Sequence, residues 1–218
     1  MSARPGVIFD IDGTLLDSTF HHALAWLRAF RSCGYGDVTA ARVHRAVGLG
    51  DEKLVPHILG HDDESVATAH SSEYASMKQE VRALPGAADL IANCTSAGLT
   101  AVLATSGKAA DLDWMLARIG AGTDLAGATT SDDVAQSKPA PDLMLAALAA
   151  HELDPARTVA VGDSVWDGRA AQAAGLSFVA LRCGGVGEEE LRAAGAVEVY
   201  DDPAALRARF GESALNFL

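Results

Sequence analysis

The sequence lacks several features that mark other classes of protein. No apolar run approaches the length that crosses a membrane. The N-terminal segment leads into only a few apolar residues, too few for the core of a signal peptide. Lys and Arg total 17 against 29 Asp and Glu, giving a formal net charge of −12, and no stretch is rich in Lys or Arg. We therefore expect no nucleic-acid partner and no membrane association.

Cysteine is also scarce. Cys33, Cys94 and Cys183 are odd in number, widely spaced and free of any CxxC or Cys/His cluster. Neither a disulfide framework nor a zinc site is expected from this pattern. Together with the lack of a signal-peptide core, this cysteine pattern predicts a soluble protein of the reducing cytoplasm. No internal repeat or low-complexity tract is present.

The 218 residues, 49% of them hydrophobic, are enough to bury a proper core. Short β-like runs alternate with stretches that are spaced as amphipathic helices, which predicts an α/β fold with a parallel sheet and helices on both faces. The expected strands are 7–9, 99–104, 125–128, 158–161, 178–181 and 197–199. The expected helices of this part are 87–97, 109–119, 142–150, 166–174 and 188–194.

Residues 17–83 break the alternation and form a predicted insert. Here helix follows helix, with candidates at 21–31, 39–47, 51–59 and 64–80. Asp17-Ser18 would cap the outgoing helix, and Leu84-Pro85-Gly86 supplies a rigid turn that returns the chain. The two linkers are then expected to lie side by side. The sequence thus predicts one domain from 1–16 and 84–218 and a second, helical domain from 17–83.

Two carboxylates lie one residue apart where the first strand ends. Asp10 and Asp12 follow the apolar run Val7–Phe9 and precede a glycine. Adjacent carboxylates at the end of a buried parallel strand repel each other by roughly 4 kcal/mol at ~4 Å and an effective dielectric of about 20. A bound divalent metal ion is the obvious reason for such a pair.

Three further groups of polar residues follow other predicted strands or loops. They are Thr105-Ser106-Gly107, Lys138 within Ser-Lys-Pro, and Gly162-Asp163-Ser164 with Asp167 behind it. In this order, and over nearly the whole chain, the four pieces resemble the motifs of the haloacid dehalogenase superfamily of phosphoryl-transfer enzymes. The resemblance is to its phosphoglycolate phosphatase and β-phosphoglucomutase-like members, and it implies a Rossmann-like catalytic core with the insert as a helical cap.

The resemblance implies a role for each of these residues. Asp10 would be the nucleophile that forms an aspartyl-phosphate, and Asp12 would be the general acid and base. Lys138 would neutralise charge, while Thr105 and the Ser106 backbone N–H would hold phosphoryl oxygens. A separate set would bind Mg²⁺, namely the Asp10 side chain, the Asp12 backbone carbonyl, Asp163 and Asp167. Nearby carboxylates are expected to raise the pKa of Asp12.

Each residue also has a purely structural interpretation. Asp12-Gly13 is common turn chemistry, and Thr105 alone is typical of a helix N-cap. Lys138 would ordinarily be a solvated charge, and Asp167 an acid of the first helical turn favoured by the helix dipole. The structural roles and the catalytic roles predict different contacts for these side chains.

The cap is where substrate selectivity is expected. His22, followed by Trp26 at helical spacing, resembles a cap histidine of the β-phosphoglucomutases that lies near the catalytic acid; a partly exposed helix histidine is the alternative. Gly48 falls in a stretch resembling the cap's substrate-facing loop. Arg45 and Lys53 flank it as candidate ligands for a substrate anion, or as solvated surface charges.

Two cap positions depart from the mutase pattern. Asp51 occupies the place of a basic ligand for the sugar phosphate, and His70 falls where a second cap cation would be expected. This favours plain phosphatase chemistry, with a phosphosugar mutase as the alternative. Haloacid dehalogenase activity is disfavoured because Asp12, Asp163 and Asp167 are all present, and a noncatalytic phosphate-binding protein would not need every group. The predicted protein is a Mg²⁺-dependent phosphatase of a small phosphomonoester, as a monomer or small homo-oligomer.

Overall fold

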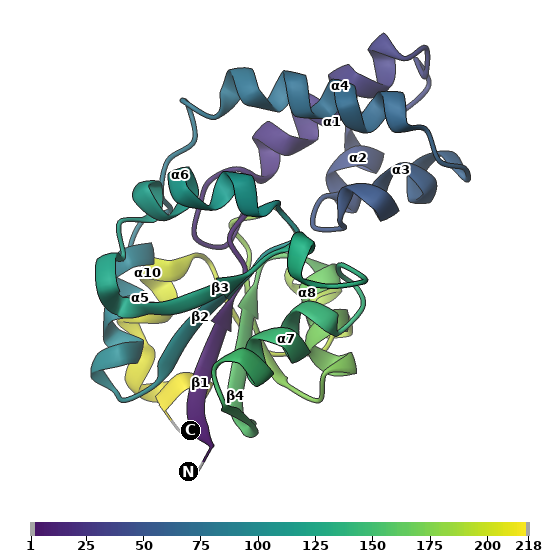
Figure 1. Ribbon diagram of the computed structural model, residues 1–218. Helices are drawn as coiled ribbons and strands as arrows, with labels where there is room; N and C mark the ends of the chain where they lie inside the picture. Colours follow the sequence, from purple (N-terminus) through teal and green to yellow (C-terminus); the bar gives the residue numbers. More distant parts are fainter. Residues whose placement is uncertain (1–2, 217–218) are drawn as a thin grey trace.

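The computed structural model describes residues 3–216 (Figure 1), so the first two and last two residues of the predicted first domain lie outside the described residues. A six-stranded parallel sheet forms its centre, in the order β3-β2-β1-β4-β5-β6. The strands are β1 (Arg4–Phe9), β2 (Thr100–Ala104), β3 (Leu125–Thr129), β4 (Leu153–Gly162), β5 (Ser177–Leu181) and β6 (Ala196–Tyr200). The predicted α/β class is confirmed.

Helices cover both faces of the sheet. Along β1, Val7 and Phe9 join one hydrophobic core and Ile8 joins the other, because successive side chains of a strand point to opposite faces. The first core is completed by α5 (Ala87–Ser96), α6 (Ala109–Ile119) and α10 (Pro203–Ala208). The second is completed by α7 (Asp142–Ala150), α8 (Val165–Ala173) and α9 (Glu188–Ala193).

The predicted elements of this part are all present, and their ends differ by a few residues. The largest difference is at β4, which begins at Leu153 rather than Thr158. Helix α10 was not predicted, although Asp202 as N-cap and Pro203 as first helical residue are start signals. Short 3₁₀ turns occur at Gly122–Asp124, Ser131–Asp133, Phe210–Glu212 and Ala214–Asn216.

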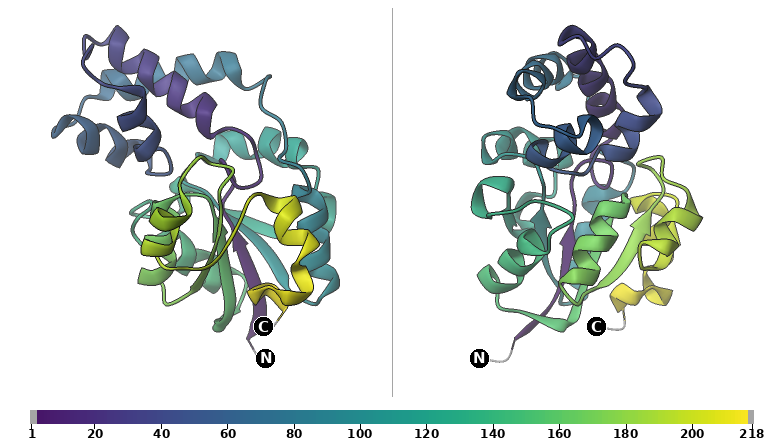
Figure 2. Two further views of the ribbon diagram at one scale, coloured as in Figure 1. Left: turned by 180° about the vertical axis from the view of Figure 1, so that it is seen from behind. Right: turned by 90° about the vertical axis from the view of Figure 1, so that its right-hand side faces the viewer.

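Four helices lie beyond the carboxyl ends of the strands (Figures 1 and 2). They are α1 (Thr19–Ser32), α2 (Ala40–Ala46), α3 (Asp51–Leu59) and α4 (Glu64–Met77). Trp26, Phe30, Leu54 and Val66 belong to a hydrophobic cluster that these helices share with Trp166 of α8. We call this helical layer the cap. Within residues 3–216, no helix combines the length and the apolar character needed to cross a lipid bilayer.

The two connections to the cap run next to each other. The Asp17 backbone N–H donates to the Arg82 carbonyl at 2.9 Å, and the Leu84 N–H donates to the Leu15 carbonyl at 2.9 Å. The predicted side-by-side linkers are therefore confirmed. Ser18 is at the N-cap position of α1, but its hydroxyl makes no capping bond to the helix, so that part of the prediction was wrong.

Candidate active site

The neighbouring strands β2, β1 and β4 end at the edge of the sheet that faces the cap (Figure 1), and a polar residue follows each of them. Asp10 directly follows β1, Thr105 follows β2 and Asp163 follows β4. All three residues are buried. Since parallel strands all end at the same edge, central strands bring their terminal residues together there, which is where ligands bind on such sheets.

Lys138 lies within this group and is only 1% exposed. Its Nζ forms ion pairs with the Asp10 carboxylate and with Asp167 Oδ1, the latter at 2.7 Å. Burial alone would lower the pKa of the Lys138 amine, but the two carboxylates outweigh it and raise that pKa. Lys138 is therefore a buried cation held between two carboxylates, and the alternative of a solvated surface charge is wrong.

Asp10, Asp163 and Asp167 form a buried acidic cluster. One carboxylate oxygen from each lies within 4.8 Å of the others. Burial raises the pKa of Asp10 to about 7 and that of Asp163 well above its ordinary value, and the neighbouring Asp167 charge adds to both. The cluster is thus short of positive charge even with Lys138 present, as expected of a site built to hold a cation.

The surroundings of Asp163 fit a small hard cation. Thr14 Oγ1 donates to Asp163 Oδ1 at 3.1 Å, and Thr19 Oγ1 donates to Oδ2 at 3.4 Å. A Cβ atom at Gly13 would come within 2.3 Å of Asp163 Oδ2, and one at Gly184 within 1.6 Å. Two glycines therefore keep space open beside an oriented carboxylate, and all-oxygen ligands of this kind are those Mg²⁺ prefers.

Asp167 is an acid of the first turn of α8, as its structural interpretation predicted, and it also belongs to the acidic cluster. As the third residue of α8 it forms a capping box with Ser164, whose N–H and hydroxyl donate to Asp167 Oδ2 at 3.0 and 2.6 Å. Its other oxygen, Oδ1, faces Lys138. The helix cap fixes the direction in which this carboxylate points into the acidic cluster.

Asp12 has different surroundings from Asp10. Its Oδ1 accepts a hydrogen bond from Ser18 Oγ at 2.6 Å and lies 3.3 Å from His22 Nε2. Burial raises the pKa of Asp12, but the charge and hydrogen bond of His22, with the Ser18 bond, outweigh it and bring the pKa below its ordinary value. The expectation of a raised pKa was wrong, because the carboxylate faces a histidine of the cap rather than the other carboxylates.

His22 is held in place by three aromatic residues of the cap. Its ring stacks on Tyr74 with centroids 3.7 Å apart, and its Nδ1 lies 3.3 Å from Nε2 of His70. His70 in turn stacks on Trp26 at 3.7 Å. Burial, followed by the charge of His22, lowers the pKa of His70 to about 2, so His70 is neutral. It is therefore not the second cap cation that its position suggested.

The Thr105-Ser106-Gly107 segment forms a turn that contacts the cap. Thr105 Oγ1 accepts from the Gly107 N–H at 2.9 Å, while the N-cap residue of α6 is Lys108, so Thr105 is not an N-cap. Ser106 Oγ donates to the Gly48 carbonyl at 3.2 Å. Gly48 thus lies across from the phosphate-binding candidates, as predicted for the cap loop.

The two predicted basic ligands of the cap do not reach this site. Lys53 Nζ donates to the Ser137 carbonyl at 2.5 Å, which ties α3 to the loop before Lys138. Arg45 lines a separate groove beside α8, where its carbonyl accepts from Trp166 Nε1 at 3.0 Å. Both predictions fail because the helical positions flanking Gly48 face the core surface rather than the cavity.

A cavity of about 60 Å³ lies between the cap and the strand ends. Its walls include Asp10, Asp12 and Thr105 from the core and His22 and Asp51 from the cap. The sequence marks Asp51 only as a departure from the mutase pattern. The spacing of residues does not predict that Asp51 lies in the cavity wall. Thr14, Thr19 and Ser18 were also missed as supporting residues, although all lie within or next to the first motif.

Comparison with known proteins agrees with this geometry. The family model of the haloacid dehalogenase-like hydrolases matches residues 7–181. Protein CbbY of Rhodobacter capsulatus is 32% identical over 188 residues, which cover 79% of this chain and 83% of that protein. A phosphoglycolate phosphatase of Rhodospirillum rubrum is 28% identical, covering 92% of this chain and 88% of its own. The crystal structure of a hydrolase from Pseudomonas syringae has a TM-score of 0.89 at 30% identity, covering 96% and 99% of the two chains.

Proposed function

This chain belongs to the haloacid dehalogenase-like hydrolases, and we propose that it is a Mg²⁺-dependent phosphatase that hydrolyses a small phosphomonoester through an aspartyl-phosphate. The observation that carries the proposal is that two carboxylates line one cavity and have different partners. Asp10 is paired with the buried Lys138, whereas Asp12 is bonded to His22 of the cap. One carboxylate is thus placed for attack and the other for proton transfer.

In the first half-reaction the Asp10 carboxylate attacks phosphorus and the bond to the ester oxygen breaks. Asp12 gives a proton to the leaving alcohol, and its bonds to Ser18 and His22 hold the carboxyl in place. In the second half-reaction Asp12 takes a proton from water as that water attacks the phosphoryl group. Inorganic phosphate leaves and the Asp10 carboxylate is restored.

Charge on the phosphoryl oxygens is offset by groups around Asp10. Lys138 supplies a buried ammonium, and Thr105 with the Ser106 N–H supplies hydrogen-bond donors. Mg²⁺, held by the carboxylates of Asp10, Asp163 and Asp167 with the Asp12 backbone carbonyl, would add positive charge at the same place.

We assign the chemistry to residues 1–16 and 84–218, and access to it to a cap formed by residues 17–83. The cavity of about 60 Å³ is far smaller than the roughly 300–1,000 Å³ usual for ligand sites, so the cap has to move away before a substrate can enter. The substrate is a small phosphate ester of the cytoplasm, and the enzyme is a monomer or small homo-oligomer.

A phosphosugar mutase is the second candidate, favoured by the contact between His22 and Asp12. A mutase needs a cationic group that binds a second phosphate, whereas the cap has Asp51 and a neutral His70 at these positions. Adding a sugar bisphosphate activator to the assay separates the two, since only a mutase would convert one sugar phosphate into its isomer.

The test of the proposed function is release of inorganic phosphate from an aryl phosphate. We expect turnover with Mg²⁺, none after chelation with EDTA, and none from Asp10→Asn, which should remain folded because the change is nearly isosteric and removes one charge from a crowded cluster. Circular dichroism of the variant is the control. Wild-type rates in Asp10→Asn, or turnover unaffected by chelation, would refute the proposal.

A further inference from the structure

A second cavity, of about 80 Å³, lies beside the one at Asp10. A shared wall separates the two, formed by Asp12, His22, Asp51, Ser106 and Gly107. With the phosphoryl group at Asp10 and Thr105, the rest of a substrate must extend along this wall. The leaving group therefore meets Asp51 whichever of the two cavities it enters.

No lysine or arginine lines the first cavity. The second is lined by Lys78 and Lys108, and each of these already has a carboxylate partner. Lys78 forms an ion pair with Asp111, and Lys108 Nζ lies 4.0 Å from Asp51 Oδ2. Among the described residues that line the two cavities, each cation has a carboxylate within 4.0 Å that would compete with a second anionic group on the substrate.

The Asp51 carboxylate has no close protein donor. Its side chain is 37% exposed, and its only ion-pair partner among the described residues is Lys108, whose Nζ is 4.0 Å from Oδ2. Burial raises the pKa of Asp51 more than Lys108 lowers it, so its surroundings favour a proton or a hydrogen-bond donor at the carboxylate. An anion placed beside it would instead add like-charge repulsion.

We propose that Asp51 selects substrates whose leaving group carries a hydrogen-bond donor and no anion of its own. The preferred esters are then phosphates of polyols, sugars or amino alcohols, and phosphorylated carboxylic acids and bisphosphates are rejected. This inference rests on the proposed phosphatase function. It sets the chain apart from the phosphoglycolate phosphatase that it resembles.

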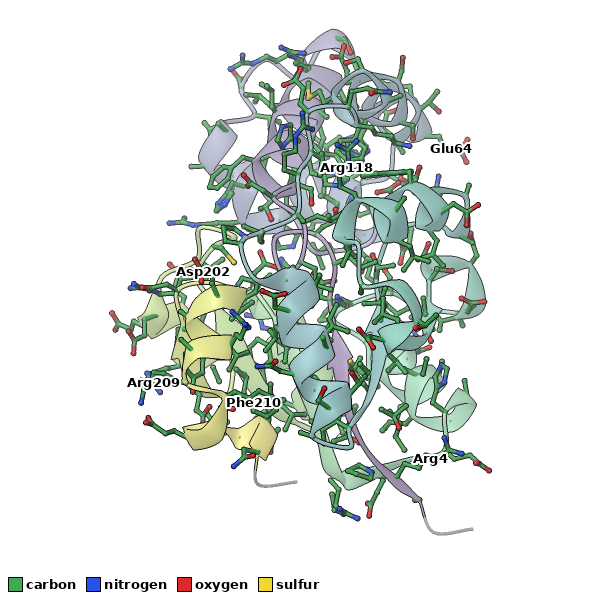
Figure 3. The ribbon with its side chains drawn as sticks, turned by 90° about the vertical axis from the view of Figure 1, so that its left-hand side faces the viewer. Arg4, Glu64, Arg118, Asp202, Arg209 and Phe210 are labelled. Atoms are coloured by element: carbon green, nitrogen blue, oxygen red, sulfur yellow. The ribbon has the colours of Figure 1, made fainter. Side chains whose placement is uncertain are left out.

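Asp51 also has a purely structural interpretation, as an acid at the first position of α3 favoured by the helix dipole. Glu64 is at the equivalent first position of α4 and lies at the outer edge of the molecule (Figure 3). Glu64→Gln is therefore a matched control for Asp51→Asn. Both substitutions remove one negative charge from the first turn of a cap helix, and only one does so at the cavity.

The experiment compares three two-carbon esters of similar size, 2-hydroxyethyl phosphate, O-phosphoethanolamine and 2-phosphoglycolate. They differ at the far end of the leaving group, which is a hydroxyl, an ammonium or a carboxylate. We measure kcat/KM for each, and the inhibition constant of each against hydrolysis of an aryl phosphate. The inhibition constants rank the three esters even where turnover is slow.

We expect the wild-type protein to favour the hydroxyl or ammonium ester over phosphoglycolate by at least about tenfold, equivalent to ~1.4 kcal/mol. Asp51→Asn should reduce this preference about tenfold, mainly by improving binding of phosphoglycolate, while Glu64→Gln leaves it unchanged. The ratio of the first two esters tells whether a hydroxyl or an ammonium is the better donor.

Phosphoglycolate used as well as the other esters by the wild-type protein, or a preference that survives in Asp51→Asn, overturns the inference. Failure of the proposed function has a different signature, because the aryl phosphate would then not be hydrolysed either. In that case calorimetric binding of the three esters to Asp10→Asn still ranks them, and equal affinities would count against the role of Asp51.

Discussion

Asp10 and Asp12 are one residue apart, yet their carboxylates have opposite surroundings. Asp10 is buried against Lys138, and its pKa is raised to about 7. Asp12 faces Ser18 and His22, and its pKa is lowered. The lowered pKa of Asp12 suits its step as a base toward water, and a cation at the acidic cluster would favour the charged form of Asp10 that attack on phosphorus needs. This division cannot be read from the Asp-x-Asp spacing, because it depends on a histidine from the cap.

At this scale we predict that Asp12→Asn lowers steady-state turnover by about 10²–10⁴-fold, the usual contribution of a general acid and base. An amide cannot exchange a proton with water, so hydrolysis of the aspartyl-phosphate is affected and the adduct accumulates. Intact-protein mass spectrometry after rapid quench measures the adduct on Asp10. Unchanged turnover, or an adduct that never rises above its wild-type level, would remove Asp12 from the mechanism.

At the scale of secondary structure, the start of α8 links folding to the acidic cluster. The capping box between Ser164 and Asp167 satisfies backbone groups of the helix and also orients an Asp167 oxygen toward Lys138. The N-cap of α10, Asp202, makes a similar bond to the Ala205 N–H at 2.8 Å, but it lies at the outside of the core (Figure 3). Both caps bond backbone groups at the start of a helix, but only the cap of α8 also orients a carboxylate of the acidic cluster.

We predict that Ser164→Ala and Asp202→Ala each lower the free energy of unfolding by about 1 kcal/mol, the usual loss of an N-cap. Only Ser164→Ala should also raise the Mg²⁺ concentration for half-maximal activity, by roughly tenfold, since an orienting partner of Asp167 is lost. Urea unfolding and metal titration of activity measure the two effects. An equal metal requirement in both variants would contradict a metal role for Asp167.

Apart from α10 and the short 3₁₀ turns, the elements were predicted from the sequence, but not every contact between them. Short apolar runs between helix-like stretches predicted all six strands, and α3 and α6 begin and end where expected. Arg45 and Lys53 were misplaced because the face of a short cap helix that meets the rest of the chain depends on how the cap packs against the strand ends. Asp51 gained its place in the cavity wall from the same docking.

At the scale of the whole molecule, a protein of net charge −12 concentrates three buried carboxylates at one point. Burial raises the pKa of Asp10 to about 7 and of Asp163 well above its ordinary value. In the unfolded chain such groups titrate near 3.9. Between these limits the two carboxyls hold more protons in the folded protein without metal than in the unfolded chain, so their contribution to stability falls as pH rises from about 4 through 7.

We therefore predict that Mg²⁺ raises the melting temperature more at pH 8 than at pH 5, because the cation favours the charged carboxylates that the fold alone disfavours. Differential scanning calorimetry with Mg²⁺ or with EDTA at each pH measures the difference. Asp163→Asn should reduce the Mg²⁺ effect at pH 8. A Mg²⁺ shift that is equal at both pH values, or larger at pH 5, would speak against metal binding by this cluster.

The paired connections at Asp17–Arg82 and Leu15–Leu84 have a consequence for the history of such proteins. A segment that leaves and returns at adjacent points can be lost, gained or exchanged in a single recombination event, with little disturbance to the sheet that carries Asp10. Selectivity and reaction chemistry can then evolve at different rates along one gene. A chimera that takes only the intervening segment from a relative is the laboratory equivalent of that event.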